Sequence, residues 1–264
     1  MRCSQPSMPS VAEGWLAATG LPAGVRAGTV LRNAPGVSEA SFGRCNLGDR
    51  CGDRPESVRR NRAHLIDWLE LPGEPMWLRQ VHGTEVFRPS SIDTGALPEA
   101  DGAVADGRDV VLAVLTADCL PVVLAEQSGR SIGIAHAGWR GLLGGVIERT
   151  FDAMQCDGAA IRAWLGPAIG PTSFQVGPEV RNAFEQEDRR SLSAFVRDQG
   201  DRWLADLYAL ARQRLTRCGI SEISGGGMDT FADKNRCHSY RRDGAHSGRM
   251  ATLVWRSCGD TPKP

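Results

Sequence analysis

The sequence of 264 residues predicts a single domain in which buried strands and helices are mixed. Val110–Leu115 is a continuous apolar run with β-branched residues, long enough for a buried strand and too short for a helix. Farther along, apolar residues recur at helical spacing within 204–218. No internal repeat or low-complexity linker interrupts the chain, and 41% hydrophobic residues are ample for one packed core.

The composition excludes several classes of partner. A formal net charge of +0 gives no electrostatic reason to expect nucleic acid or an anionic membrane as a partner. The most hydrophobic run, Val110–Ala125, contains Asp118 and is shorter than the roughly 20 residues that span a bilayer. Eight scattered cysteines form no compact disulfide framework, and the first residues contain no apolar export signal. We therefore expect a soluble cytoplasmic protein with no nucleic-acid or membrane partner, and we slightly favour a monomer.

The N-terminal third begins with a flexible lead-in, expected over residues 1–20, before a domain over residues 21–258. Pro35–Asp53 is rich in glycine and polar residues and predicts a loop. Asp53 is expected to cap a helix, with Pro55 in its first turn and Glu56 as a capping-box partner.

The central stretch predicts strands that end on reactive side chains. Met76–Val81 alternates as a strand does and ends at His82. Pro121–Ala125 and Ser131–Ala135 predict two more buried strands, and a helix opens at Gly138 and runs to about Cys156. Later elements are predicted at Ile161–Leu165 (strand), Pro178–Phe184 and Leu204–Cys218 (helices) and Met250–Trp255 (strand).

Three possible metal ligands, His82, Cys119 and His136, each lie where a predicted strand ends. Singly, each would more often be a packed or hydrogen-bonded residue, but three coincidences among only five histidines favour a shared site. Two imidazoles and a thiolate suit zinc with a fourth, open position, as in catalytic zinc sites. Copper is the alternative metal, although a trinuclear oxidase cluster needs more histidines than the chain contains.

The same residues also permit a different chemistry. Cys119 paired with His136 or His82 could act as a nucleophile, as in cysteine hydrolases, with Asp118 orienting the histidine. The sequence leaves both possibilities open.

An anion site is expected next to these residues. Arg140 lies in the first turn of the helix after Gly138, where guanidinium and free amides suit phosphate. Further candidates for substrate binding are a ring that could stack, a glutamine on the strand face of His82, and polar loop residues: Trp139, Gln80, Arg44, Asn46 and Arg241.

Several motifs resemble one known family, the YfiH-like family, which is often labelled multicopper polyphenol oxidase or "laccase domain". The resemblance runs from about Gly36 to Trp255 and is carried by RQVHGTEV (79–86), TADCLPVVL (116–124), GIAHAGWRGLLGGVIERT (133–150), WLGPAIGP (164–171) and SYRRDG…GRMA (239–251). It implies an α+β fold, a single domain of layered mixed β-sheets flanked by helices. It also implies a zinc site on His82, Cys119 and His136.

The resemblance implies action on purine nucleosides: phosphorolysis of adenosine, inosine, guanosine or methylthioadenosine, and deamination of adenosine. In that case Arg140 would hold phosphate, and Asp118 would move protons during deamination while zinc provides hydroxide at neutral pH. The chain departs from the family pattern at Met228-Asp229-Thr230 and at Cys237, which leaves the metal site unchanged but leaves the substrate preference along this loop open.

Overall fold

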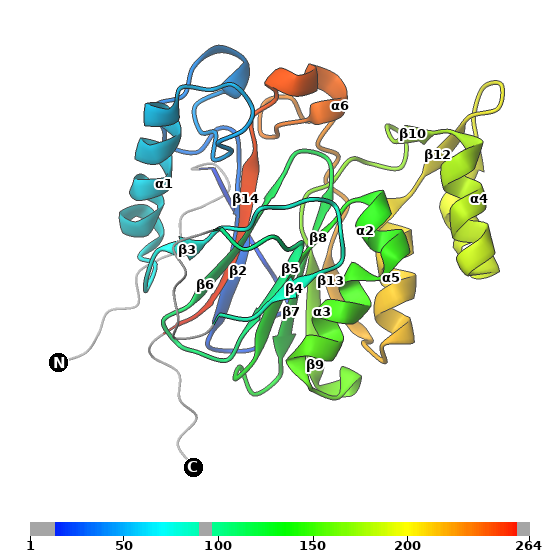
Figure 1. The fold of residues 1–264 in the computed structure, drawn as a ribbon, viewed down its shortest axis with the longest axis horizontal. Coiled ribbons are helices and arrows are strands. Elements are labelled where there is room, and N and C mark those ends of the chain that lie inside the picture. The colour runs from blue at the N-terminus through cyan, green and yellow to red at the C-terminus, as the bar shows by residue number, and fades with distance from the viewer. Residues whose placement is uncertain (1–13, 90–96, 258–264) are drawn as a thin grey trace.

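Two large β-sheets pack face to face at the centre of the molecule, as the computed structural model shows for residues 14–89 and 97–257 (Figure 1). The first has five strands, in the order β1 (Trp15–Ala17), β2 (Val25–Val30), β14 (Met250–Arg256), β6 (Val111–Thr116) and β3 (Pro75–Met76). The second has six strands, in the order β13 (Glu222–Gly225), β9 (Ile161–Leu165), β7 (Leu120–Glu126), β8 (Ile132–Ala137), β5 (Gly102–Ala105) and β4 (Val86–Phe87). Both sheets mix parallel and antiparallel pairs.

The central strands have continuous apolar sequences because both of their faces are buried. In β6, Leu112 and Val114 point between the sheets and meet Val123 and Ile134 of the second sheet. The alternate residues of β6 point outward into a separate cluster under a helix. The expected layered α+β arrangement is therefore confirmed.

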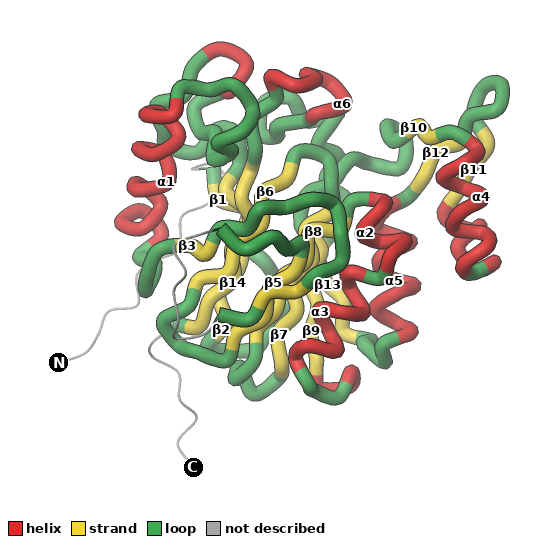
Figure 2. The backbone as a smooth tube through the Cα atoms, viewed as in Figure 1, coloured by secondary structure: helices red, strands yellow, loops and turns green. Residues whose placement is uncertain are grey.

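Helices cover the outer faces of both sheets (Figure 2). Helix α1 (Pro55–Leu69) packs Leu65 and Leu69 on the five-stranded sheet. Helices α2 (Trp139–Gly144), α3 (Val146–Met154) and α5 (Leu207–Arg217) share a core with the six-stranded sheet. No helix among the described residues is both long and apolar enough to cross a membrane.

A smaller unit extends from this side of the molecule. Its three strands follow the order β10 (Gln175–Val176), β12 (Trp203–Ala205) and β11 (Phe195–Arg197), and α4 (Pro178–Glu187) packs on them through Phe184. The remaining helical segments among the described residues are α6 (Tyr240–Asp243) and short 3-10 turns at Ala40–Phe42, Gly158–Ala160, Arg189–Ala194 and Gly244–His246.

The N-terminal boundary differs from the sequence-based expectation. Residues 1–13 of the expected lead-in lie outside the described residues, but Trp15–Ala17 forms β1 and pairs with β2. The reason is burial, because the indole of Trp15 is fully enclosed against Trp255. The ordered fold therefore begins before residue 21.

The expected helix from Gly138 to about Cys156 is wrong in one respect: it is two helices. Gly145 adopts φ 91°, a left-handed conformation that ends α2, and α3 starts directly after it. The expected strand at 76–81 is also mostly wrong, because β3 ends at Met76 and only a single bridge from Arg79 to Glu99 follows.

The capping prediction for α1 is wrong as well. Arg54, not Asp53, is the residue before the helix, and it makes no side-chain capping bond. The carboxylate of Asp53 instead accepts hydrogen bonds from Ser38 and Asn46, which tie the preceding loop together.

Candidate metal centre

Two imidazoles and a thiol meet at one end of the sheets. The ligand atoms of His82, Cys119 and His136 all lie within 4.8 Å of one another. The Cys119 Sγ is 3.8 Å from Nε2 of His82, and the two imidazole rings stand edge to face with their centroids 4.8 Å apart. The structure thus brings together three residues that are separated by up to 54 positions (136 − 82) in the chain.

Each of these side chains comes from a different part of the fold. Cys119 lies in the short turn between β6 and β7, where the chain passes from the five-stranded sheet to the six-stranded sheet. His136 is part of β8, and His82 lies in the loop between β3 and β4. The site therefore sits where the ends of the two sheets meet.

The backbone near the site adopts unusual conformations. His82 and Asp118 have φ values of 61° and 89°, in the left-handed region that side chains other than glycine rarely adopt. Gly138 opens α2 directly beside the ligands, where a Cβ atom would lie 2.9 Å from Cys119 Sγ and 3.1 Å from Cδ2 of His82. Only glycine fits there without displacing a ligand.

The carboxylate of Asp101 is fully buried beneath the two histidines. It lies 2.8 Å from Nδ1 of His136 and accepts hydrogen bonds from the backbone N–H groups of Val81, His82 and Gly83. Burial opposes ionisation of this carboxyl group, but these bonds and the charge of His136 outweigh it and lower the pKa of Asp101.

The electrostatics favour an ionised thiol. Burial raises the pKa of Cys119, but the imidazoles of His136 and His82 lower it by more. The net result is a pKa of about 6, compared with the ordinary value of 9.0. Burial lowers the pKa of His136, whereas the Cys119 and Asp101 charges raise it to about 9. A thiolate is the form of cysteine that binds a metal ion or attacks an electrophile.

The donor set fits a zinc ion. Two imidazole nitrogens and one thiolate are zinc ligands, and the group lines an open cavity from which a fourth ligand can enter. The remaining histidines lie elsewhere: His64 and His246 are exposed, and buried His238 bonds to the carbonyl of Cys45. The described residues contain no second histidine-rich group that would hold further copper ions.

A cavity of about 590 Å³ opens over the His-Cys-His group. Its walls are rich in arginine, and its other large side chains are aromatic or aliphatic; the arginines are Arg50, Arg62, Arg79, Arg140, Arg241 and Arg249. The lining acids are Asp49 and Asp118. The cavity is therefore cationic overall and suits an anion next to an apolar group.

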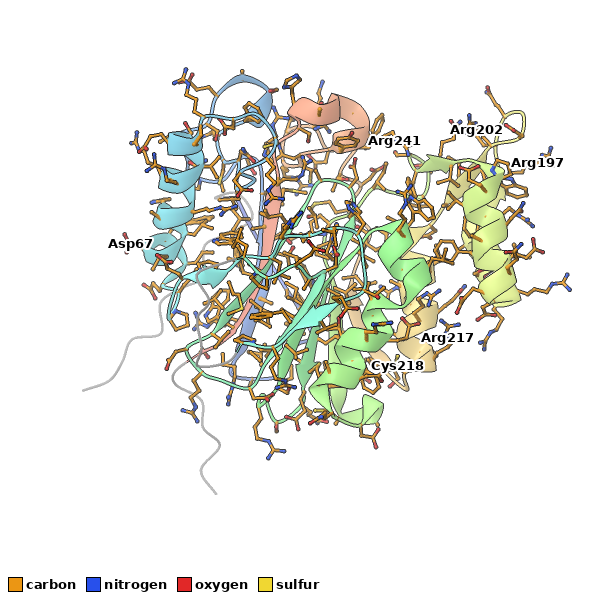
Figure 3. The ribbon with its side chains drawn as sticks, viewed as in Figure 1. Asp67, Arg197, Arg202, Arg217, Cys218 and Arg241 are labelled. Carbon is orange, nitrogen blue, oxygen red and sulfur yellow. The ribbon has the colours of Figure 1, made fainter. Side chains whose placement is uncertain are left out.

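Four residues expected to bind substrate line this cavity: Gln80, Trp139, Arg140 and Arg241. The Arg140 guanidinium lies over the ring of Trp139, with 4.3 Å from its carbon to the ring centroid. Arg241 follows the first residue of α6 and reaches toward β10, where it donates to the carbonyl of Gln175 (Figure 3). Gln80 exchanges two hydrogen bonds with the backbone of Leu115.

The other two candidates, Arg44 and Asn46, are not among the cavity residues. Arg44 is exposed, and Asn46 is fully buried. The amide of Asn46 bonds to the backbone of Gly48 and Arg249, so its contacts organise the loop that forms one wall.

Asp118 holds the C-terminal part of the chain against the site. Its carboxylate accepts hydrogen bonds from the hydroxyls of Thr230 and Ser239 and from the backbone N–H of Arg241, at 2.6, 3.0 and 2.6 Å. Thr230 belongs to the loop that departs from the family pattern, and neighbouring Asp229 accepts bonds from Gly170 and Ser173. This loop therefore supports the cavity wall.

Sequence reasoning missed Asp101, Arg50 and Arg249. Asp101 reads as one of several acidic loop residues, and nothing local to it marks a contact with residues 81–83 and 136. Arg249 belongs to the SYRR…GRMA motif region, so the motif itself was the available signal. Arg50 carries no such signal, because arginines are frequent throughout this chain.

A family model described as "Multi-copper polyphenol oxidoreductase laccase" matches residues 26–257. A Xylella fastidiosa protein named purine nucleoside phosphorylase is 50% identical over 246 residues, which cover 90% of this chain and 94% of the relative. The Escherichia coli protein named purine nucleoside phosphorylase YfiH is 44% identical over 220 residues, covering 83% of this chain and 89% of the relative.

Solved structures agree with the fold. A crystal structure of a Neisseria meningitidis protein superposes with a TM-score of 0.88 at 41% identity, covering 93% of this chain and 100% of that chain. The structure of YlmD from Geobacillus stearothermophilus gives a TM-score of 0.85 at 28% identity, covering 95% and 99%. Because the family model and these relatives match most of its length, the chain belongs to the laccase-like YfiH family.

Proposed function

We propose that this protein is a zinc-dependent purine nucleoside phosphorylase. The observation that carries the proposal is that one cavity joins the His-Cys-His group to arginines that lack a carboxylate partner. The names of the relatives at 44 to 50% identity support the same reaction.

The phosphate would bind to Arg140 and Arg241. Among the described residues neither guanidinium pairs with a carboxylate, whereas Arg62 and Arg79 face Asp49 and Glu99. Arginines without an acidic partner are available to a phosphate dianion, to which each can donate two parallel N–H hydrogen bonds.

The nucleoside would occupy the apolar part of the cavity. Trp139, Phe174 and Tyr240 line it and offer aromatic surfaces to a purine. A volume of about 590 Å³ lies within the usual range of roughly 300 to 1,000 Å³ for small-molecule sites.

The proposed reaction forms one bond and breaks one. A phosphate oxygen bonds to C1′ of the ribose while the C1′–N9 bond breaks, and its electron pair leaves with the purine, which gains a proton. The arginines hold the phosphate and aromatic walls hold the base, so the chain contributes mainly by orienting the two reactants. His82, Cys119 and His136 would hold a zinc ion, which would supply Lewis acidity in this cavity.

We also propose that the site deaminates adenosine, with water replacing the exocyclic amine to give inosine and ammonia. Asp118 lines the cavity and would carry the protons. Its carboxylate already accepts three hydrogen bonds, so this role requires one of the donors to move away. In an Asp118→Asn variant we expect deamination to be lost; a variant that deaminates at the wild-type rate would exclude this role.

The direct test is to incubate the purified protein with inosine or adenosine, with and without phosphate, and to measure metal content on the same sample. We expect base release that depends on phosphate, ribose 1-phosphate as the co-product, and about one zinc per chain. Base release at equal rates without phosphate, or none at all, would contradict the phosphorylase proposal. Copper in an active sample, with oxidation of phenols, would favour an oxidase instead.

A second candidate, a cysteine hydrolase, is favoured by one observation. Cys119 contacts His136, whose Nδ1 lies 2.8 Å from Asp101, so Asp101 and not the expected Asp118 would orient the histidine of such an enzyme. Cys119→Ala separates the two: loss of zinc together with nucleoside turnover supports a ligand, and retained zinc with lost activity supports a nucleophile.

We infer that the protein works in the cytoplasm as a monomer. The six cysteines within the described residues all carry free thiols, which a reducing compartment maintains. Gel filtration that gives the mass of a dimer would contradict the monomer.

A further inference from the structure

We propose that Asp101 is the positioning residue of the metal centre, holding both histidines in their binding geometry before an ion arrives. The inference rests on the zinc site of the proposed function. It concerns a side chain that contacts neither the cavity nor the ion, because Asp101 is fully buried and absent from the cavity wall.

Asp101 fixes the ring of His136 in two ways. Its carboxylate lies 2.8 Å from Nδ1, so the proton on that nitrogen points toward Asp101 and Nε2 is left to bind metal. Its backbone carbonyl also accepts the N–H of His136 at 2.7 Å. Side chain and main chain are therefore held by the same residue.

Asp101 also shapes the loop that carries His82. Residues 81–83 belong to no strand, and His82 has a left-handed φ of 61°. Three successive N–H groups of this loop, from Val81, His82 and Gly83, converge on the carboxylate at 3.1, 3.0 and 2.7 Å. A single anion thus compensates for an unfavourable backbone conformation at one ligand while it orients the ring of the other.

Position 101 demands a carboxylate. Four donors meet its two oxygens: Nδ1 of His136 and the N–H of His82 reach Oδ1, and the N–H groups of Val81 and Gly83 reach Oδ2. An asparagine has one acceptor oxygen and would turn an N–H₂ group against two of these donors. The isosteric change Asp101→Asn therefore removes the positioning without a change of volume.

The test compares zinc affinity in the wild type, Asp101→Asn and Asp106→Asn, measured by competition with a chelator. Asp106 follows the other end of β5, is exposed and pairs with Arg88, so its variant controls for the lost charge. We expect Asp101→Asn to bind zinc about tenfold to a hundredfold more weakly, and Asp106→Asn to match the wild type. Equal zinc affinities for Asp101→Asn and the wild type would overturn the positioning role of Asp101 and would leave the proposed zinc site intact.

A measurement on the wild type covers the case in which Asp101→Asn does not fold. In the zinc-loaded protein, ¹⁵N spectra of labelled histidines should show His136 bound through Nε2 with its proton on Nδ1. Metal on Nδ1 of His136 would overturn the inference. A wild-type protein that binds no zinc would overturn the metal site itself, and Asp101's role with it.

Discussion

Gly138 lies beside the thiol of Cys119, and its missing side chain sets how closely the ligands approach. We expect Gly138→Ala to weaken zinc binding by about tenfold to a hundredfold, because overpacking of this kind costs roughly 1 to 3 kcal/mol. The backbone tolerates alanine, since φ is −66° at this position. Zinc titration checks the prediction, and Gly107→Ala, where the nearest atom is a methyl group of Val110, is the control. Wild-type affinity in Gly138→Ala would show that the ligands have room to move.

His238 makes stability depend on pH. Burial, and then the charges of Arg32 and Arg249, lower its pKa from 6.5 to about 4, and Nδ1 has no hydrogen-bond partner. Because the folded protein binds this proton more weakly than the unfolded chain, the contribution is fully present above pH 6.5. It is lost as the pH falls through 4, and it amounts to about 3 kcal/mol.

Urea unfolding between pH 7 and pH 4 measures this contribution. His238→Asn should flatten the pH dependence in that window, whereas His64→Asn, which changes an exposed histidine, should not. Parallel curves for His238→Asn and the wild type would contradict the assignment.

At the level of single residues, the sequence identifies the expected metal ligands better than the residues that hold the ligands and loops in place. His82, Cys119 and His136 follow recognisable strands or motifs, so a chemical reading of strand ends finds them. Asp101 and Asn46 act through contacts with distant backbone, which depend on how loops fold and leave no local pattern. Their roles emerge only from the tertiary structure.

Among the elements, helices α3, α4 and α5 are joined by one buried arginine. The guanidinium of Arg214 on α5 pairs with Glu148 of α3 and Glu187 of α4, at 2.8 and 2.9 Å, and its side chain is only 5% exposed. Arg217 reaches the same glutamates from a side chain that is 28% exposed.

These two arginines form a matched pair for mutation. We expect Arg214→Gln to lower the free energy of unfolding by about 2 to 3 kcal/mol, because it removes the charge-assisted hydrogen bonds that a buried guanidinium donates to two partly exposed glutamates. Arg217→Gln should cost at most about 1 kcal/mol, since water screens an exposed pair. Urea denaturation compares the two, and equal losses would contradict the burial argument.

The sequence predicts the strands that are buried on both faces, and it does not predict the shortest strands. The apolar runs in the sequence predict β6, β7, β8, β9 and β14. Strand β2 was missed because it contains Gly28, a position where a Cβ would lie 2.4 Å from the ring of Trp15. Strands of two to four residues, such as β10 and β12, are too short to show the alternation of apolar and polar residues that indicates a strand. They form because they pair with strands that are distant in the sequence.

For the whole molecule, the metal centre is expected to stabilise both sheets at once. Cys119 joins the two sheets, and His136 belongs to one of them, so an ion bound there opposes their separation. Zinc at about 100 times its dissociation constant should add roughly 2.7 kcal/mol to the free energy of unfolding.

Thermal unfolding with and without zinc tests this expectation. The melting temperature should rise in the wild type and not in Cys119→Ala. An equal rise in both proteins would place the stabilising ion elsewhere.

Strand β14 lies between β2 and β6, although the ribosome makes it some 130 residues after β6 (250 − 116 = 134). A nascent chain therefore holds two open strand edges until Arg256 has emerged from the exit tunnel, and such edges invite pairing with other chains. A chain whose translation stops before Met250 would therefore keep both edges unpaired and would be expected to aggregate.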